Sequence, residues 1–246
     1  MIDAYNTYNN KAYRFISFEG LENTLKFKKL RLSRADQFND PLDNSPFLMP
    51  LEWDKYLKYG DKFVKKQSEK AFIDVFGSVY ICCFSKTYTS DKSYLMWSHY
   101  AQNHTQVCFE IDFSKVKYLG NPSEVIYPES LFDKRNSEHK NSGDLGRFVV
   151  LNKDKIWEYE QEVRLIYDLK FANNHPDVII QNKGKNLNVP FDHKLVSKVI
   201  FGYRAKEEDE KSIINKFKEL NHIPKFEKMN LNPYKLKLEP VTLKVN

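Results

Sequence analysis

The sequence predicts a single α+β domain over residues 1–246. Strand and helix patterns interleave along the chain without the strict β-α-β alternation that a parallel sheet requires. No stretch rich in proline, glycine or serine divides the 246 residues, and 41% of them are hydrophobic, which is enough to bury a sizeable core. This composition excludes a disordered chain, a collagen-like chain and a small disulfide scaffold.

In the first third of the chain, a polar leader precedes a strand, a helix and a second strand. Residues 13–18 have the pattern of a strand, and leucines spaced along 21–30 predict a short helix that leads into a strand at 30–32. The following segment, 35–46, contains an Asn-Asp-Pro sequence whose side chains favour turns, so we expect an ordered loop. The apolar spacing over 51–76 then predicts one or two amphipathic helices.

The middle of the chain predicts a buried strand, a helix and a further strand. Residues 78–84 form a nearly continuous apolar run, which is typical of a buried strand. The spacing over 94–101 predicts a helix, and residues 107–113 alternate as the next strand. Residues 129–144 are polar and have no clear period, so we expect a surface segment there.

The last third predicts two strands, a helix and two closing strands. Residues 156–169 alternate well enough for a long strand, and 198–201 predict another. Over 207–220 the apolar residues share one side and acids fill the first turn, a pattern typical of a helix. Two short strands at 225–229 and 234–238 complete the domain.

Charge, cysteine usage and absent motifs narrow the class of protein. The chain has 39 Lys and Arg against 33 Asp and Glu, a net charge of +6 that suits a basic patch rather than a basic tail. Its three cysteines lack metal-ligand spacing, and no apolar run has the length of a signal peptide or a membrane span. We therefore expect a cytoplasmic protein with no membrane contact and no metal site. The absence of GxxxxGK[ST], GxGxxG, HExxH and GxSxG motifs disfavours nucleotide triphosphatases, Rossmann dehydrogenases, zinc hydrolases and ordinary serine hydrolases.

The most informative segment is 157–164. If it is a strand, a period of two places four charged residues on one face: Glu158, Glu160, Glu162 and Arg164. One interpretation is a solvent-facing strand with basic partners on the neighbouring strands. The other is a catalytic carboxylate, Glu162 or Glu160, with Arg164 orienting it or holding a phosphate.

A second candidate segment runs from Ser85 to Tyr100. Ser85 follows the buried strand, where it either caps the next element or contributes to a site. Trp97, His99 and Tyr100 predict a stacking and hydrogen-bonding surface for a nicotinamide or a base. The alternative for His99 is an ordinary half-buried histidine.

Cations gather near the N-terminus. Arg14 lies in the first strand between two aromatic residues, where it is either a stacked surface residue or a phosphate clamp. Between 26 and 34 there are five cations and no acid: Lys26, Lys28, Lys29, Arg31 and Arg34. These five are the best candidates for contact with a nucleic acid, although lysine-rich faces also serve solubility.

Six sequence blocks follow one another along the chain: Tyr13-Arg14-Phe15, Phe38-Asn39-Asp40-Pro41-Leu42-Asp43, Cys83-Phe84-Ser85, 96–101, 107–112 and 157–164. In this order, they resemble the bacterial family DUF2971. The resemblance covers roughly 13–204 and leaves a C-terminal helix and closing strands at 205–246. One departure is Gln106, where the family usually has glycine.

A second likeness suggests an activity. Arg in a first strand, Ser after a middle strand and Glu-x-Glu in a late strand are similar to the triad of ADP-ribosyltransferases. Those enzymes are α+β domains that bind NAD in a cleft between two sheets, so the likeness implies two mixed or antiparallel sheets flanked by helices. It also implies that Arg14 holds the phosphates or ribose of NAD, Ser85 shapes the nicotinamide-ribose site, and Glu162 stabilises the ribosyl cation.

The sequence thus favours an NAD-dependent ADP-ribosyltransferase, with NAD as its substrate. Its acceptor is a nucleic acid or a protein, and relatives of this kind resemble toxins or anti-phage effectors that an antitoxin restrains. Two alternatives stay open. One is a nuclease in which His99 or His104 works with Glu162, and the other is a non-enzymatic module that binds RNA or a protein.

Overall fold

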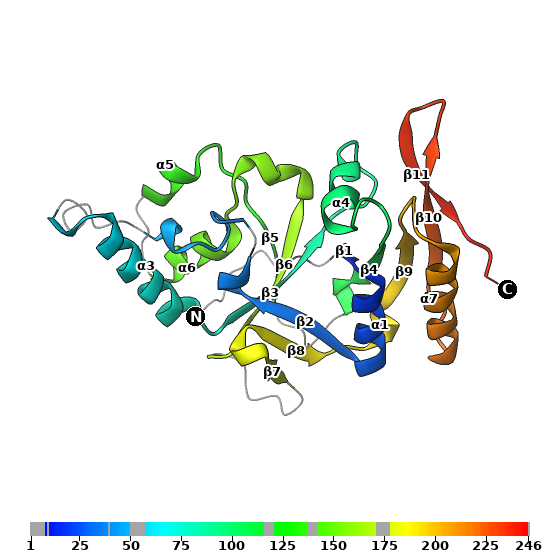
Figure 1. The fold of residues 1–246 in the computed structure, drawn as a ribbon, viewed down its shortest axis with the longest axis horizontal. Coiled ribbons are helices and arrows are strands. Elements are labelled where there is room, and N and C mark those ends of the chain that lie inside the picture. The colour runs from blue at the N-terminus through cyan, green and yellow to red at the C-terminus, as the bar shows by residue number, and fades with distance from the viewer. Residues whose placement is uncertain are drawn as a thin grey trace.

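The computed structural model describes residues 8, 10–38, 40–49, 58–115, 121–136, 142–170 and 178–245. The first part of the helical segment expected at 51–76 therefore lies outside the described residues, as do Asn39 of the predicted loop and 137–141 of the polar segment. Figure 1 shows strands through the middle of the molecule, with helices α3, α5 and α6 at one end and α7 at the other.

Eleven strands of the described chain form one sheet with the order β11-β10-β9-β4-β1-β3-β2-β8-β7, and β6 branches from β3 and also pairs with β5. The strands are β1 (Lys11–Ile16), β2 (Lys29–Arg34), β3 (Val79–Ser85), β4 (Val107–Asp112), β5 (Asn121–Glu124), β6 (Glu162–Asp168), β7 (Ile179–Gln181), β8 (Asn186–Pro190), β9 (Val196–Phe201), β10 (Lys225–Asn232) and β11 (Lys237–Thr242). The α-helices of the described chain are α1 (Phe18–Phe27), α3 (Asp61–Phe76), α4 (Ser93–Tyr100), α5 (Leu131–Asn136), α6 (Ser142–Leu151) and α7 (Glu207–Glu219).

The sheet branches at β3. One edge of β3 pairs with β6 over its whole length. The other edge is shared, because Tyr13 of β1 lies opposite Ser85, whereas β2 meets β3 at Ile81 and Tyr80. β1 and β2 therefore separate along the middle of β3. The described residues therefore form one branched sheet. The two sheets implied by the likeness to ADP-ribosyltransferases are not formed in this part of the chain.

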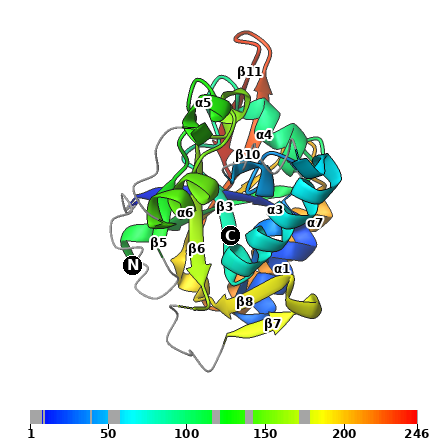
Figure 2. The ribbon, with the colours of Figure 1, turned by 90° about the vertical axis from the view of Figure 1, so that its left-hand side faces the viewer.

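Helices α1 and α7 cover the same face of the central strands (Figure 2), and Ser212 of α7 donates a hydrogen bond to Glu22 of α1. The N-terminus of α1 is capped by Ser17, whose Oγ accepts from the Gly20 amide at 3.0 Å. Ile213 and Phe217, on the apolar side of α7, are fully buried in the main hydrophobic core. The predicted helices at 21–30 and 207–220 are confirmed in place, although α1 begins at Phe18.

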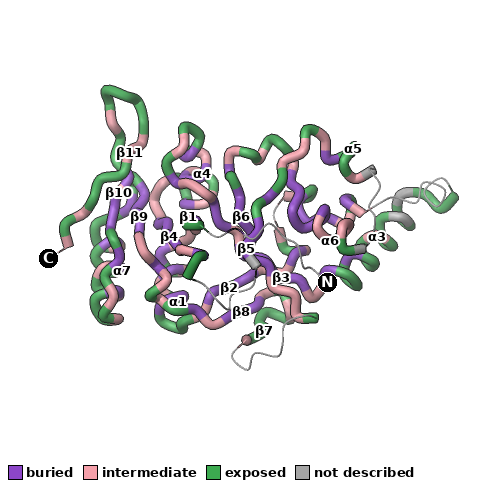
Figure 3. The backbone as a smooth tube through the Cα atoms, turned by 180° about the vertical axis from the view of Figure 1, so that it is seen from behind, coloured by how far each residue is buried: buried purple, intermediate pink, exposed green. Residues whose placement is uncertain are grey.

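Two further hydrophobic clusters complete the packing. Trp97 and Ala101 of the α4 segment pack on the other side of the central strands, beside Cys108 and Ile200. Helices α3 and α6 pack at the end of the sheet formed by β3 and β6. Figure 3 shows that buried residues gather in the central strands, whereas β7 and the outer surface of α3 are exposed. None of the helices in the described part of the chain is long and apolar enough to cross a membrane.

The expected long strand at 156–169 is confirmed only in its second part, because the first part is not a strand. Lys155–Glu160 is a 3-10 helix, and β6 begins only at Glu162. Asp154 caps the 3-10 helix by accepting a hydrogen bond from the Ile156 amide at 3.0 Å. Gln161 then adopts the left-handed conformation with φ of 44°, which turns the chain into the strand. Alternation in the sequence therefore spans two different elements.

Sequence patterns also missed several elements. The polar segment at 129–144 contains α5 and the start of α6 rather than only surface loop. Strands β5, β7 and β8 were not predicted, and β8 forms because Leu187 and Val189 point into the core opposite β2. Short strands of this kind depend on a partner in the sheet more than on their own pattern.

Candidate functional site

A cavity of about 300 Å³ opens where β1 and β2 separate along β3. We call it the site cavity. Side chains from β1, β2, β3 and α4 line it, together with Lys153, Glu160 and Glu162. The register of the sheet explains in part why these side chains lie together, since Ser85 of β3 is opposite Glu162 on one side and opposite Tyr13 on the other. Three strands that are distant in sequence therefore bring charged residues to one hollow.

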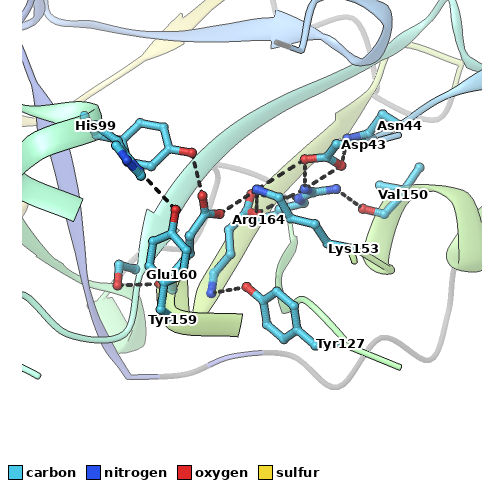
Figure 4. A network of polar contacts seen from close by, with 12 residues as sticks. Asp43, Asn44, His99, Tyr127, Val150, Lys153, Tyr159, Glu160 and Arg164 are labelled. Atoms are coloured by element: carbon cyan, nitrogen blue, oxygen red, sulfur yellow. Dashed lines mark hydrogen bonds and ion pairs between the residues drawn. The ribbon is translucent and has the colours of Figure 1, made fainter. Parts of the chain in front are cut away.

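Glu160 forms part of one wall of the site cavity and is almost fully buried. The Tyr100 hydroxyl donates to its Oε1 at 2.5 Å, and the Lys153 ammonium lies 2.5 Å from its Oε2. Tyr100 comes from α4 and Lys153 from the turn after α6, so two separate elements orient this carboxylate. Figure 4 shows the network that links Glu160, Lys153, Arg164 and Asp43.

Glu162 lies in the same wall and is held by two cations. Arg164 Nε donates to its Oε1 at 2.7 Å, and Lys153 Nζ lies 3.3 Å from its Oε2. Its backbone amide donates to the Tyr127 hydroxyl at 2.9 Å. Both oxygens and the backbone of Glu162 are therefore fixed before any ligand enters.

Arg164 is completely buried beneath this wall. Its Nη2 donates to both carboxylate oxygens of Asp43, at 2.7 and 2.6 Å, and its Nη1 donates to the Val150 carbonyl at 2.7 Å. The Phe38 ring lies over the guanidinium at 5.4 Å. Since its donors are engaged inside the protein, Arg164 orients Glu162 and does not itself line the cavity. The solvent-facing interpretation of the 157–164 segment is therefore wrong for Glu160, Glu162 and Arg164, and only Glu158 is exposed.

The environments of the two carboxylates push their pKa values apart. Burial raises the pKa of Glu160 above its usual value, and the nearby Glu162 charge raises it further, despite the Lys153 ammonium. Burial would also raise the pKa of Glu162, but the charges of Arg164 and Lys153 outweigh it and lower that pKa to about 2. The site thus pairs a carboxyl that accepts a proton readily with one that stays ionised, which is a common arrangement in acid–base catalysis.

Arg14 and Arg31 supply positive charge to the site cavity. Arg14 lies across the gap between the strands: its Nη2 donates to the Arg31 carbonyl at 3.2 Å, and its Nη1 contacts Sγ of Cys82. Its guanidinium also lies 5.9 Å from the centre of the Phe84 ring. A half-buried guanidinium that faces a cavity is suited to a phosphate or carboxylate group.

Ser85 is buried at the end of β3. Its Oγ lies 2.7 Å from the Glu160 carbonyl and 2.8 Å from the Thr87 carbonyl. The hydroxyl therefore ties β3 to the 3-10 helix and positions the backbone of Glu160. Its contribution to the site cavity is mainly to place a carboxylate.

The predicted stacking surface of Trp97, His99 and Tyr100 is not formed. Trp97 is fully buried, where its Nε1 donates to the Tyr88 carbonyl and its ring packs on Phe15. His99 is exposed, with Nδ1 3.0 Å from the Tyr159 hydroxyl, and only Tyr100 lines the site cavity. Trp97 and His99 are two residues apart on the helix and point to nearly opposite sides, so the three side chains cannot share one face.

The five N-terminal cations are divided among different environments. Lys26 and Lys28 are exposed at the end of α1, and Lys29 is half-buried. Arg31 lines the site cavity, while Arg34 forms a two-bond ion pair with Asp36 at 2.6 and 2.8 Å. Asp36 neutralises Arg34 and lies just outside the range 26–34, so the charge of that range alone does not reveal the ion pair.

The structure also places the histidines of the nuclease alternative. His104 is half-buried, and its Nε2 lies 3.0 Å from Ser98 Oγ. Neither His99 nor His104 lines the cavity that contains Glu162, so the geometry does not favour that acid–base pair. Within the described ranges, no group of three or more His, Cys, Asp or Glu side chains is placed to hold a metal ion.

Two residues of the network were not identified from the sequence. Asp43 belongs to the Phe-Asn-Asp-Pro-Leu-Asp block, so its position in a predicted ordered loop was the available signal. Lys153 had no such signal, because it follows α6 in a segment with no motif. Its importance arises from burial between Glu160, Glu162 and Asp43.

Fold and site together define a mixed α/β protein in which a buried ion network borders a cavity lined by both charged and apolar side chains. The family model DUF2971, described as "Protein of unknown function", matches residues 96–165. The resemblance inferred from the sequence is therefore confirmed over this segment, which contains Tyr100, Lys153, Glu160, Glu162 and Arg164. No curated protein and no solved structure matches the chain.

Proposed function

We propose that the protein is an ADP-ribosyltransferase that cleaves NAD at the bond between nicotinamide and ribose. The observation that carries the proposal is the meeting of Arg14, Ser85 and Glu162 at one cavity, from three strands that pair in register. Enzymes of this class bind NAD in a cleft between two sheets, and here the cavity where β1 and β2 separate within one branched sheet would take the place of that cleft.

The two carboxylates have different roles in this reaction. The bond between ribose C1′ and the nicotinamide nitrogen breaks, and its electron pair goes to nicotinamide. A nucleophile of the acceptor forms the new bond to C1′. The ionised Glu162 stabilises the positive charge that develops on the ribose, since a fixed anion in a buried site lowers the energy of that transition state. Glu160, whose pKa is raised, accepts the proton that the attacking nucleophile loses.

The opposite wall suits the rest of the substrate. Arg14 and Arg31 bind the pyrophosphate, for which planar guanidinium groups are well matched. Phe15 and Phe38 supply apolar surface for the nicotinamide ring. A volume of about 300 Å³ is at the lower end for small-molecule sites, so the nicotinamide and its ribose occupy the cavity and the adenosine extends out of it.

The acceptor of ADP-ribose is a nucleic acid or a protein, as expected of a toxin or anti-phage effector with an antitoxin partner. We propose that the reaction takes place in the cytoplasm, where NAD is available as the substrate. The transferase is preferred to the nuclease because the carboxylates, and not the histidines, face the cavity.

The test is release of nicotinamide from NAD by the purified protein. We expect Glu162→Gln to reduce the rate by about 10²–10³-fold and Glu160→Gln by at least about 10²-fold. Arg14→Lys should raise KM about tenfold, because lysine lacks the planar fork. Glu158→Gln is the matched control, since this neighbouring carboxylate is exposed and should leave the rate unchanged.

Folding of each variant is checked by circular dichroism, so that a lost rate is not mistaken for a lost fold. Absence of NAD cleavage by wild-type protein, with and without candidate acceptors, would overturn the proposal. Cleavage of RNA without NAD would favour the nuclease instead. Full activity of both Glu160→Gln and Glu162→Gln would show that neither carboxylate is catalytic, whether the protein is a transferase or a nuclease.

A further inference from the structure

A second cavity lies away from the ion network, at the N-terminal end of α4. Its volume is about 500 Å³, and we call it the hairpin cavity because the β10–β11 hairpin forms one side. Figure 1 shows this hairpin rising beside α4. Its lining includes Tyr94, His104, Tyr203, Arg204, Leu236 and Lys237.

The hairpin cavity presents aromatic surface to solvent. Tyr94 is 52% exposed and Tyr203 is 39% exposed, and Leu236 adds an apolar side chain that is 83% exposed. Three large exposed side chains around one hollow are unusual for surface that only contacts water. Tyrosine rings of this kind stack on planar aromatic groups, and nucleic-acid bases are the commonest such ligands with a phosphate attached.

The charge of the hairpin cavity favours an anion. Lys237 is already paired with Asp91 at 2.7 Å, so these two charges cancel. Arg204 is exposed and forms no ion pair with a carboxylate of the described residues, which leaves its guanidinium available. A guanidinium that has no carboxylate partner among the described residues, beside exposed tyrosine rings, matches a phosphate beside a base.

Hydrogen bonds fix the main chain from which the Arg204 side chain extends. The Arg204 amide donates to the His104 carbonyl at 2.9 Å, and the Gly202 amide donates to the Gln106 carbonyl at 2.8 Å. Hydroxyl groups of Thr89 and Ser90 line the same cavity and can bind a sugar or phosphate oxygen. A main chain that is ordered before binding loses less entropy when the ligand arrives.

We propose that the hairpin cavity binds a nucleotide, with its base stacked on a tyrosine ring and its phosphate on Arg204. This site is separate from the cavity assigned to NAD and does not depend on the proposed reaction. A free nucleotide and a single-stranded nucleic acid both carry a base and a phosphate, so either could bind here. Two different probes distinguish these two ligands.

The experiment measures binding of two probes to the full chain: AMP by calorimetry, and a fluorescein-labelled ten-nucleotide single-stranded RNA by anisotropy. Tyr203→Ala and Arg204→Gln should each weaken binding about tenfold, as expected for loss of one stacking surface or one phosphate contact. Tyr234→Ala is the control for the aromatic change, because Tyr234 is 97% exposed on the same hairpin but does not line the cavity. Lys206→Gln is the control for the charge change, since this exposed lysine lies two residues from Arg204 and outside the cavity.

Binding of both probes supports a nucleotide site that accepts either source, and binding of RNA alone supports a site for nucleic acid. In each case Tyr203→Ala and Arg204→Gln must weaken binding more than their controls do. Three results overturn the proposal. The first is no binding of either probe at millimolar concentration, and the second is an equal loss of affinity in the variants and their controls. The third is a loss of affinity only in a double variant of the exposed N-terminal lysines, Lys26→Gln with Lys28→Gln, which would place the binding surface there. NAD cleavage by Arg204→Gln should stay at the wild-type rate, so failure at this site is distinct from failure of the proposed enzyme.

Discussion

The ammonium group of Lys153 lies between two buried carboxylates, 2.5 Å from Glu160 Oε2 and 3.3 Å from Glu162 Oε2. Asp43 is also close, at 3.5 Å, and Arg164 provides the second cation of the cluster. When all five groups are ionised, the carboxylates outnumber the cations by one. This excess is consistent with the raised pKa of Glu160, because each neighbouring negative charge makes its ionised form less favourable.

Lys153→Met should destabilise the protein by about 3–5 kcal/mol, because removing one partner leaves buried charges without compensation. The measurement is the free energy of unfolding in urea. Glu160→Gln added to Lys153→Met removes one carboxylate together with the one cation and should recover part of the loss. A double variant that is less stable than the sum of the two single changes would contradict this account.

Glu162 should make stability sensitive to acid. Its pKa in the folded protein is about 2, below the ordinary value of 4.5, so its contribution is complete above pH 4.5 and is lost as the pH falls toward 2. Between pH 5 and pH 3 this amounts to about 2 kcal/mol. Urea unfolding at both pH values should show a smaller loss for Glu162→Gln than for wild type. Glu158→Gln serves as the control and should lose as much as wild type; equal losses in all three proteins would show that Glu162 is not responsible.

Asp43→Asn tests the link between the 40–49 loop and the ion network. Asp43 accepts two bonds from Arg164, so the change should destabilise the protein by about 1–3 kcal/mol and speed amide hydrogen exchange in the loop. NAD cleavage should fall because Arg164 no longer orients Glu162 correctly. Asp40→Asn in the same loop is the control: Asp40 accepts a local bond from the Leu42 amide, and asparagine can keep it. A larger effect at Asp40 than at Asp43 would exclude the link.

Gly202→Ala should destabilise the protein by about 1–3 kcal/mol, because a Cβ at this position would overlap the backbone carbonyls of His104 and Gln106. The same shift should displace His104 and weaken nucleotide binding in the hairpin cavity. Gly146→Ala is the contrasting change, since a methyl group added at this position of α6 meets no neighbouring atom and alanine favours helices by about 0.5–1 kcal/mol. Thermal unfolding of the two variants should therefore shift in opposite directions.

Local patterns identified several elements well. The apolar run at 78–84 is β3, the acids and apolar residues over 207–220 form α7, and the alternation at 107–113 is β4. These segments were predictable because the spacing of their own apolar residues defines the side that packs in the core, whichever neighbouring element covers it. The segment at 156–169 was not predictable in this way, since the left-handed Gln161 ends one element and permits the next.

The sequence by itself determined which segments carry the candidate chemistry, because the charged blocks that include Arg14, Glu160 and Glu162 are visible as residue types in order. Only the tertiary structure decided that Arg164 is buried, since its partner Asp43 lies 121 positions away in the chain. It also decided that Lys153 joins both carboxylates and that Trp97 is core rather than surface. The physical reason is that burial and ion pairing depend on which distant elements meet, and no local pattern records that meeting.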